Sequence, residues 1–132
     1  MASITTSIKK ELYRMEIESP SGNVVIADEP LESGGQDLGF SPKELLISAL
    51  GTCTSATLRM YADRKGWDLQ EVKIEVDLDR DEKGTKTIFN CKIQLFGELD
   101  EEQRARLLTI AKACPVHKIL THPIEINTEF AL

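Results

Sequence analysis

The segment that decides the fold is residues 41–62, SPKELLISALGTCTSATLRMYA. It predicts one long helix, because Ser41 can serve as the N-cap, Pro42 suits the first helical position and Glu44 completes a capping box. A helix that is apolar over most of its circumference is normally buried, so we expect this one to be covered on most sides. The stripe at helical spacing consists of Leu46, Leu50, Cys53, Thr57 and Met60.

Composition and charge describe one globular domain of modest size. Of the 132 residues, 29% are charged and 41% are hydrophobic, which is ordinary for a soluble protein. We therefore expect a single domain over residues 1–132. The formal net charge of −6 argues against a nucleic-acid partner, because phosphate binding needs a basic surface.

The termini and the cysteines bear on cellular location. No apolar run approaches the ~20 residues of a membrane span, and residues 1–7 lack the pattern of a signal peptide. We therefore expect a cytoplasmic protein without a membrane partner. The chain has three cysteines, an odd number without a dense framework, so we expect any disulfide to be catalytic rather than structural.

The order of the remaining elements indicates an α+β fold with antiparallel sheets. Strands do not alternate with helices, which argues against a parallel doubly wound sheet. Five short strands cannot easily bury the long helix, so we infer a homodimer in which two such helices pack together between the sheets. In chain order we expect strands near 8–18 and 24–26, the long helix, strands at 72–78 and 87–95, a helix capped at Asp100, a short helix over 115–120 and a strand from Pro123.

The three cysteines receive different interpretations. Cys91 lies on the apolar face of the strand at 87–95, which predicts plain core packing. Cys114 precedes Pro115 at the junction with the short helix, where free N–H groups favour a thiolate. Cys53 and Cys114 could be two core cysteines, a pair of redox thiols, or part of a metal site. The metal interpretation rests on the Cys-x-x-His form of Cys114 and His117, which lacks the second pair that structural zinc needs.

Three segments taken together resemble the OsmC/Ohr family, the osmotically induced and organic hydroperoxide resistance proteins. They are SPKELL at 41–46, ALGTCT at 49–54 and ACPVH at 113–117. The resemblance covers nearly the whole chain. It implies an intertwined homodimer, with two long central helices enclosed by antiparallel sheets and active sites at the subunit interface. It also implies a thiol-dependent peroxidase that needs no metal, haem or flavin.

The resemblance assigns a role to two of the thiols. Cys53 matches the family's peroxidatic cysteine, whose thiolate attacks the O–O bond of an organic hydroperoxide and becomes a sulfenic acid. Cys114 matches the resolving cysteine, which condenses with the sulfenic acid to a disulfide and protects Cys53 from over-oxidation. An external dithiol, in the family often a lipoylated protein, then restores both thiols by exchange.

The family's activating pair is matched imperfectly. Family members hold the peroxidatic cysteine as a thiolate with an arginine that is itself held by a glutamate. Here Lys43 stands where many catalytic relatives have the glutamate, and Glu44 follows one position later. Glu44 can equally be a helix cap. Arg14 lies roughly where some relatives carry the arginine and can equally be a solvent-facing residue, whereas Arg59 points elsewhere on the helix.

These departures suggest a divergent OsmC-like branch and leave two other classes open. One is a binding protein that has kept the fold and holds an apolar ligand in its interface cavity. The other is a redox sensor, in which a Cys53–Cys114 disulfide signals to a partner without peroxidase turnover.

Overall fold

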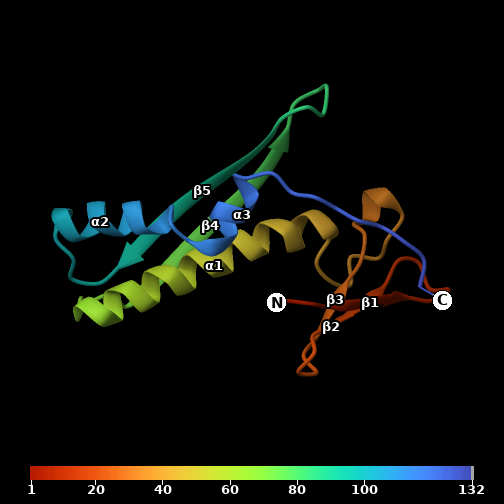
Figure 1. Cartoon of the computed structure of the whole chain (residues 1–132), viewed down its shortest axis with the longest axis horizontal. Coiled ribbons are helices and arrows are strands. Elements are labelled where there is room, and N and C mark those ends of the chain that lie inside the picture. Colours follow the sequence, from red (N-terminus) through yellow and green to blue (C-terminus); the bar gives the residue numbers. More distant parts are fainter. Residues whose placement is uncertain (132) are drawn as a thin grey trace. The chain divides into compact units, whose positions relative to one another are not determined.

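A computed structural model describes residues 1–131 of the chain (Figure 1). The fold is α+β with antiparallel sheets, as the sequence predicts. The chain divides into two compact units, residues 1–46 and the part from Ile47 onward. A single domain over residues 1–132 stays a prediction. Among residues 1–131, no helix is long and apolar enough to cross a bilayer.

The first unit contains a three-stranded antiparallel sheet in the order β1-β2-β3. Its strands are β1 (Thr5–Ile8), β2 (Met15–Glu18) and β3 (Val24–Ala27). The prediction of one strand over 8–18 is wrong, because β1 and β2 pair with each other and the chain between them leaves the sheet. The polar run at 9–11 is fully exposed and has no apolar face to bury. The returning strand is confirmed as β3.

The buried carboxylate of Asp28 organises the loop that follows β3, which includes the short 3-10 helix η1 (Leu31–Ser33). Burial raises the pKa of Asp28, but four backbone N–H donors together lower that pKa below its ordinary value of 3.8. The loop is therefore built around a charged group inside the first unit. The donors are the N–H groups of Tyr13, Glu29, Gln36 and Leu38.

The long helix is confirmed as α1 (Pro42–Lys65). The Glu44 N–H donates to Ser41 Oγ at 3.2 Å, and the Ser41 N–H donates to Glu44 Oε1 at 2.9 Å, which is the predicted capping box. Within the single chain this helix is not covered on most sides, since Met60 is 62% exposed, and its cover by a second copy stays a prediction. The chain covers one face, and its buried residues recur at every fourth position: Leu50, Thr54, Leu58 and Ala62.

The predicted second hairpin consists of β4 (Glu71–Arg80) and β5 (Thr87–Phe96), which pair antiparallel along their whole length. On β4 the half-buried residues alternate with exposed ones, as expected for a strand with one covered face. The prediction that Cys91 packs in the core is wrong. Cys91 is exposed, because the rest of the chain leaves this part of β5 uncovered.

Two helices follow the hairpin, α2 (Glu101–Ala111) and α3 (Pro115–Leu120). At the start of α2 the Gln103 N–H donates to Asp100 Oδ1 at 2.7 Å, so the expected cap is confirmed. The strand predicted from Pro123 is wrong, because residues 123–131 are exposed and pair with no strand. The core of this unit joins α1, α2 and the loop before β4, through Leu58, Ala62, Leu69, Leu107 and Ala111.

Candidate functional site: the thiols of Cys53 and Cys114

Cys114 is the N-cap of α3, and its side chain is fully buried. The backbone N–H of His117 donates to Cys114 Sγ at 3.2 Å. This bond uses one of the N–H groups that have no partner inside a helix. Pro115 takes the first helical position, where its missing N–H costs nothing. The prediction that this thiol faces the free N–H groups of the short helix is therefore confirmed.

Thr54 gives the same sulfur a second polar neighbour. Its Oγ1 lies 3.5 Å from Cys114 Sγ, and either atom can be the donor. Thr54 is itself buried, at 5% exposure, and follows Cys53 directly in α1. The contact therefore ties the cysteine segment of α1 to the start of α3, across 60 positions of sequence.

The sequence contained a signal for Thr54 that the interpretation missed. The predicted stripe passes through Cys53 and Thr57. Each lies one position before a residue of the buried line of α1, which contains Thr54 and Leu58. On that line Thr54 is the one polar residue between Leu50 and Leu58. A buried polar group needs a hydrogen-bond partner. The position of Thr54 on this line therefore predicts a partner on another element.

Cys53 is half-buried. All three cysteines are free thiols. Its partial exposure lets a small oxidant reach it, whereas Cys114 is closed to solvent. Cys53 lies one position before Thr54, which contacts Cys114 Sγ. By access alone, Cys53 is the candidate for attack on an oxidant and Cys114 the candidate for capture of the oxidised sulfur.

The two residues predicted to activate Cys53 make local contacts. Glu44 is engaged in the capping box with Ser41. Arg14 Nη1 donates to Glu16 Oε1 at 3.2 Å. The roles of Glu44 and Arg14 toward Cys53 stay predictions.

The side chain of Arg59 makes its hydrogen bonds near the end of α1. Its guanidinium donates to Asp63 Oδ1, at 2.6 Å from Nη2, and to the carbonyl oxygen of Leu69. These bonds hold the guanidinium beside the turn that leads into β4. The expectation that Arg59 points elsewhere is therefore confirmed.

The metal interpretation finds no support in the geometry of the described chain. Among residues 1–131, no group of three or more His, Cys, Asp or Glu side chains is arranged to hold a metal ion. His117 approaches Cys114 through its backbone N–H. That contact is a cap, not a pair of ligands.

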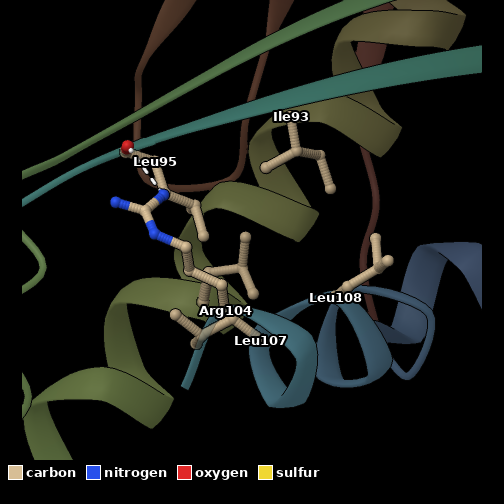
Figure 2. A pocket seen from close by; sticks show the side chains of 6 residues that line it. Ile93, Leu95, Arg104, Leu107 and Leu108 are labelled. Atoms are coloured by element: carbon tan, nitrogen blue, oxygen red, sulfur yellow. Dashed lines mark hydrogen bonds between the residues drawn. The ribbon is translucent and has the colours of Figure 1, made fainter. Parts of the chain in front are cut away.

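A largely apolar cavity of about 220 Å³ lies beside Leu58, one turn of α1 after Thr54 (Figure 2). Figure 2 shows the Arg104 guanidinium turned toward the backbone of Leu95, where Nη1 donates to the carbonyl oxygen at 3.3 Å. The rest of the lining is hydrocarbon, which suits an apolar group. The lining residues are Leu58, Ile93, Leu95, Arg104, Leu107 and Leu108.

These observations define a small α+β protein in which α1 carries the half-buried thiol of Cys53 and α3 begins at the buried thiol of Cys114. The sequence model of the OsmC-like protein family matches residues 34–129. The chain therefore belongs to the OsmC-like protein family, as its motifs suggest. No curated protein matches it significantly in sequence.

Solved structures agree with this assignment. A Psychrobacter arcticus 273-4 protein assigned to the osmotic stress and detoxification response is 25% identical, with 93% of this chain and 90% of that chain covered and a TM-score of 0.79. The organic hydroperoxide resistance protein OsmC of Legionella pneumophila is 21% identical, with 92% and 89% covered and a TM-score of 0.68. OhrB of Bacillus subtilis, also an organic hydroperoxide resistance protein, is 20% identical, with 92% and 90% covered and a TM-score of 0.63. These likenesses show that the chain has the fold of OsmC and Ohr proteins.

Proposed function

We propose that this protein is a thiol-dependent peroxidase that reduces organic hydroperoxides to alcohols, with Cys53 as the attacking thiol and Cys114 as the resolving thiol. One observation carries the proposal. The buried sulfur of Cys114 is bonded by the His117 N–H at 3.2 Å and contacted by the Thr54 hydroxyl at 3.5 Å, and Thr54 adjoins the half-buried Cys53. A core cysteine packed only against hydrocarbon would not have the polar neighbours that Cys114 has.

In the first step the Cys53 thiolate attacks an oxygen of the peroxide bond. The O–O bond breaks, the alkoxide leaves and takes up a proton to become the alcohol, and Cys53 becomes a sulfenic acid. The half-buried position of Cys53 admits the peroxide while leaving part of the side chain against the protein. We place the hydrocarbon substituent of the peroxide in the apolar cavity beside Leu58, four positions after Thr54 on α1.

In the second step the Cys114 thiolate attacks the Cys53 sulfenic acid. A disulfide forms and the sulfenic oxygen leaves as hydroxide, which takes up a proton from solvent to become water. This removes the intermediate before further oxidation. The His117 N–H stabilises negative charge on the attacking sulfur, because hydrogen bonds to charged groups are stronger than neutral ones. The Thr54 hydroxyl fixes the direction of that sulfur.

The cycle closes when an external dithiol of the lipoyl type reduces the Cys53–Cys114 disulfide by exchange. The proposal includes no bound cofactor. It also includes a homodimer, in which a second copy covers the exposed part of α1, and an activating arginine at Arg14 held by Glu44. We place the second copy against the exposed side of α1 that carries Met60.

The test is turnover of cumene hydroperoxide with dihydrolipoamide as the reductant, comparing the wild type with Cys53→Ser and Cys114→Ser. We expect multiple turnover by the wild type and none by Cys53→Ser. Cys114→Ser should turn over at first and then lose activity faster, as Cys53 is over-oxidised. If the fully reduced wild type does not turn over, the lipoyl-dependent peroxidase is wrong.

The cavity supports a second candidate, an apolar-ligand binder that does not turn over peroxide. Its volume of about 220 Å³ and its leucine-rich lining suit a short hydrocarbon group. A binder keeps its affinity for a fluorescent apolar probe in Cys53→Ser. Binding by both proteins, without peroxidase turnover by the wild type, would favour this candidate.

A further inference from the structure

An aromatic and basic cluster lies where the last turns of α1 meet α2. Arg106 Nε of α2 donates to Tyr61 Oη of α1 at 3.0 Å. The Tyr61 ring packs edge to face against Trp67, and the two ring centroids are 5.5 Å apart. Lys65 is the next residue of α1 on the side of Tyr61. We call Tyr61, Lys65, Trp67 and Arg106 the seam cluster.

Two cations of the seam cluster lie beside the same ring. The guanidinium carbon of Arg106 and Nζ of Lys65 are each 5.7 Å from the centre of the Tyr61 ring, within the range of a cation–π contact. The pKa of Tyr61 is lowered first by the hydrogen bond from Arg106, against opposing burial, and further by the charges of Arg106, Lys65 and Arg64. The seam is therefore a place of positive potential.

These two cations have no carboxylate partner in the part of the chain that the structure describes. Neither Lys65 nor Arg106 belongs to the ion pairs found among residues 1–131. An arginine carries five N–H donors, and the bond to Tyr61 uses the one on Nε of Arg106. That bond fixes the plane of the guanidinium, so its two Nη groups are oriented for a carboxylate, which can accept from both at once.

The seam cluster lies away from the side on which we place the second copy. On α1, Lys65 is about 140° around the helix from Met60, and on α2, Arg106 is about 160° around from Leu108. Met60 and Leu108 are the exposed apolar residues of these two helices that a second copy would cover, whereas Lys65 and Arg106 are exposed on the other side. A homodimer of this kind leaves the seam cluster open to solvent.

The composition and charge of the seam cluster fit an acidic protein. Trp, Tyr and Arg are the residue types enriched among those that dominate binding at protein interfaces, and Trp67 is the single tryptophan of the chain. The net charge of −6 repels an acidic protein from most of the surface. The unpaired cations at the seam attract it, so they favour one orientation of the encounter.

We propose that the seam cluster is the docking surface for an acidic protein domain that delivers the external dithiol. This docking rests on the proposed peroxidase, whose disulfide needs such a reductant. Tyr61 follows Cys53 by eight positions in α1, which is ~12 Å along the helix axis. A domain held at the seam is therefore close to the sulfur that its dithiol has to reach.

The reaction that docking serves is a balanced exchange. One thiolate of the dithiol attacks Cys53 Sγ, and the Cys53–Cys114 bond breaks with Cys114 leaving as a thiolate. The second thiol of the dithiol, as its thiolate, then attacks the mixed disulfide and releases Cys53 as a thiolate. The dithiol gives two electrons and becomes a disulfide, and both protein thiols are restored. The seam residues hold the partner and take no part in these bonds.

The first experiment measures docking without any thiol reaction. An acidic lipoyl domain that has no tryptophan is added in its unlipoylated form, and the fluorescence of Trp67 reports binding. We expect a saturable change, with the Kd raised about tenfold in Lys65→Glu and in Arg106→Gln. Raising the ionic strength from about 0.01 M to about 0.1 M should weaken binding, because the Debye length falls from ~30 Å to ~10 Å.

The matched control is Lys83→Glu, which makes the same change of charge as Lys65→Glu at a distant place. Lys83 lies in the turn after β4 and is exposed. The ten residues of β4 separate this turn from the end of the strand next to Trp67 by ~33 Å. Lys83→Glu should therefore bind the lipoyl domain almost as the wild type does.

The second experiment measures delivery of the dithiol. The wild type and Lys65→Glu are oxidised with one equivalent of cumene hydroperoxide and reduced either by the dihydrolipoyl domain or by free dihydrolipoamide, in stopped flow. We expect Lys65→Glu to be reduced about tenfold more slowly by the domain. Its reduction by dihydrolipoamide should be unchanged, because this small dithiol is uncharged and does not dock.

The outcomes separate docking from the peroxidase. No saturable change of the Trp67 fluorescence, or equal weakening by Lys65→Glu and Lys83→Glu, would overturn the docking surface. So would equal slowing of Lys65→Glu with the domain and with dihydrolipoamide, since the substitution would then act on the disulfide itself. If the wild type does not react with the peroxide, the peroxidase is wrong, and the fluorescence titration still decides whether the seam cluster binds the acidic domain.

Discussion

The Thr54 hydroxyl oxygen lies 3.5 Å from the buried sulfur of Cys114, and this contact joins α1 to α3. Two other hydroxyls of α1 bond within the helix. Thr52 Oγ1 donates to the Ser48 carbonyl oxygen and Ser55 Oγ to that of Gly51, each at 2.8 Å. Such back-bonding is the usual choice for a helical hydroxyl. Thr54 instead points its hydroxyl toward another element, which marks it as part of the site.

Thr54→Val should slow the formation of the Cys53–Cys114 disulfide. Valine keeps the shape of the side chain and removes the polar contact to Cys114, which is worth about 1 kcal/mol, or roughly a fivefold change in rate. The measurement is the loss of free thiols after one equivalent of cumene hydroperoxide. Thr54→Ser keeps the hydroxyl and is the control. If valine and serine resolve the sulfenic acid equally fast, the hydroxyl has no part in positioning Cys114.

Helix starts were predictable from the sequence because their chemistry is local. Ser41 with Glu44, and Asp100 with Gln103, bond across three residues, so the pattern carries its own partners. The same holds for Cys114, which bonds the His117 N–H three positions away. The short helix and the environment of the Cys114 thiol could therefore be predicted from the sequence.

Features that depend on contacts with residues far away in the sequence could not be predicted. Cys91 alternates correctly with its neighbours on β5, yet it is exposed, because alternation identifies a face and not what covers it. Residues 123–131 alternate as a strand would, but they have no partner strand among residues 1–131. Asp28 looked like an ordinary loop residue because its four N–H donors lie up to 15 positions away.

Asp28→Asn should lower the melting temperature of the protein near neutral pH. The charged carboxylate accepts four backbone hydrogen bonds, whereas an amide turns its NH₂ group toward some of these donors. The measurement is thermal unfolding followed by circular dichroism. Asp37→Asn is the matched control, because Asp37 lies exposed in the same loop and its positive φ of 54° suits asparagine. Equal melting temperatures for the two variants would contradict the role of Asp28.

The stabilising effect of Asp28 should also depend on pH. Its pKa in the folded protein lies below the ordinary value of 3.8, so the folded state binds the proton less readily than the unfolded state does. The contribution is therefore complete well above pH 3.8 and is lost as the pH falls through the folded pKa. The difference in melting temperature between wild type and Asp28→Asn should shrink on acidification. A constant difference down to the most acidic pH would exclude a charge effect.

Arg106→Gln should raise the pKa of Tyr61 toward its ordinary value of 10.0. The hydrogen bond from Arg106 Nε to Tyr61 Oη, at 3.0 Å, is the largest cause of the lowered pKa. Burial opposes it, and the charges of Arg106, Lys65 and Arg64 add smaller decreases. The measurement is an ultraviolet titration of tyrosinate with Tyr13→Phe as the background. Arg64→Gln should raise the pKa less, and an equal effect of both variants would show that overall charge and not the hydrogen bond lowers it.

Leu107→Ala should cost far more stability than Leu108→Ala, although the two leucines are neighbours on α2. Leu107 is fully buried in the core of the second unit, whereas Leu108 is 54% exposed. Removing a buried leucine side chain costs roughly 2–5 kcal/mol, because transfer free energy is lost and a cavity remains. For Leu108 we expect a cost of about 1 kcal/mol or less, in proportion to the smaller area it buries. The measurement is urea unfolding, with similar m-values required for the comparison. If Leu108→Ala costs as much as Leu107→Ala, a second copy of the chain covers Leu108 in solution, and the cost should then depend on protein concentration.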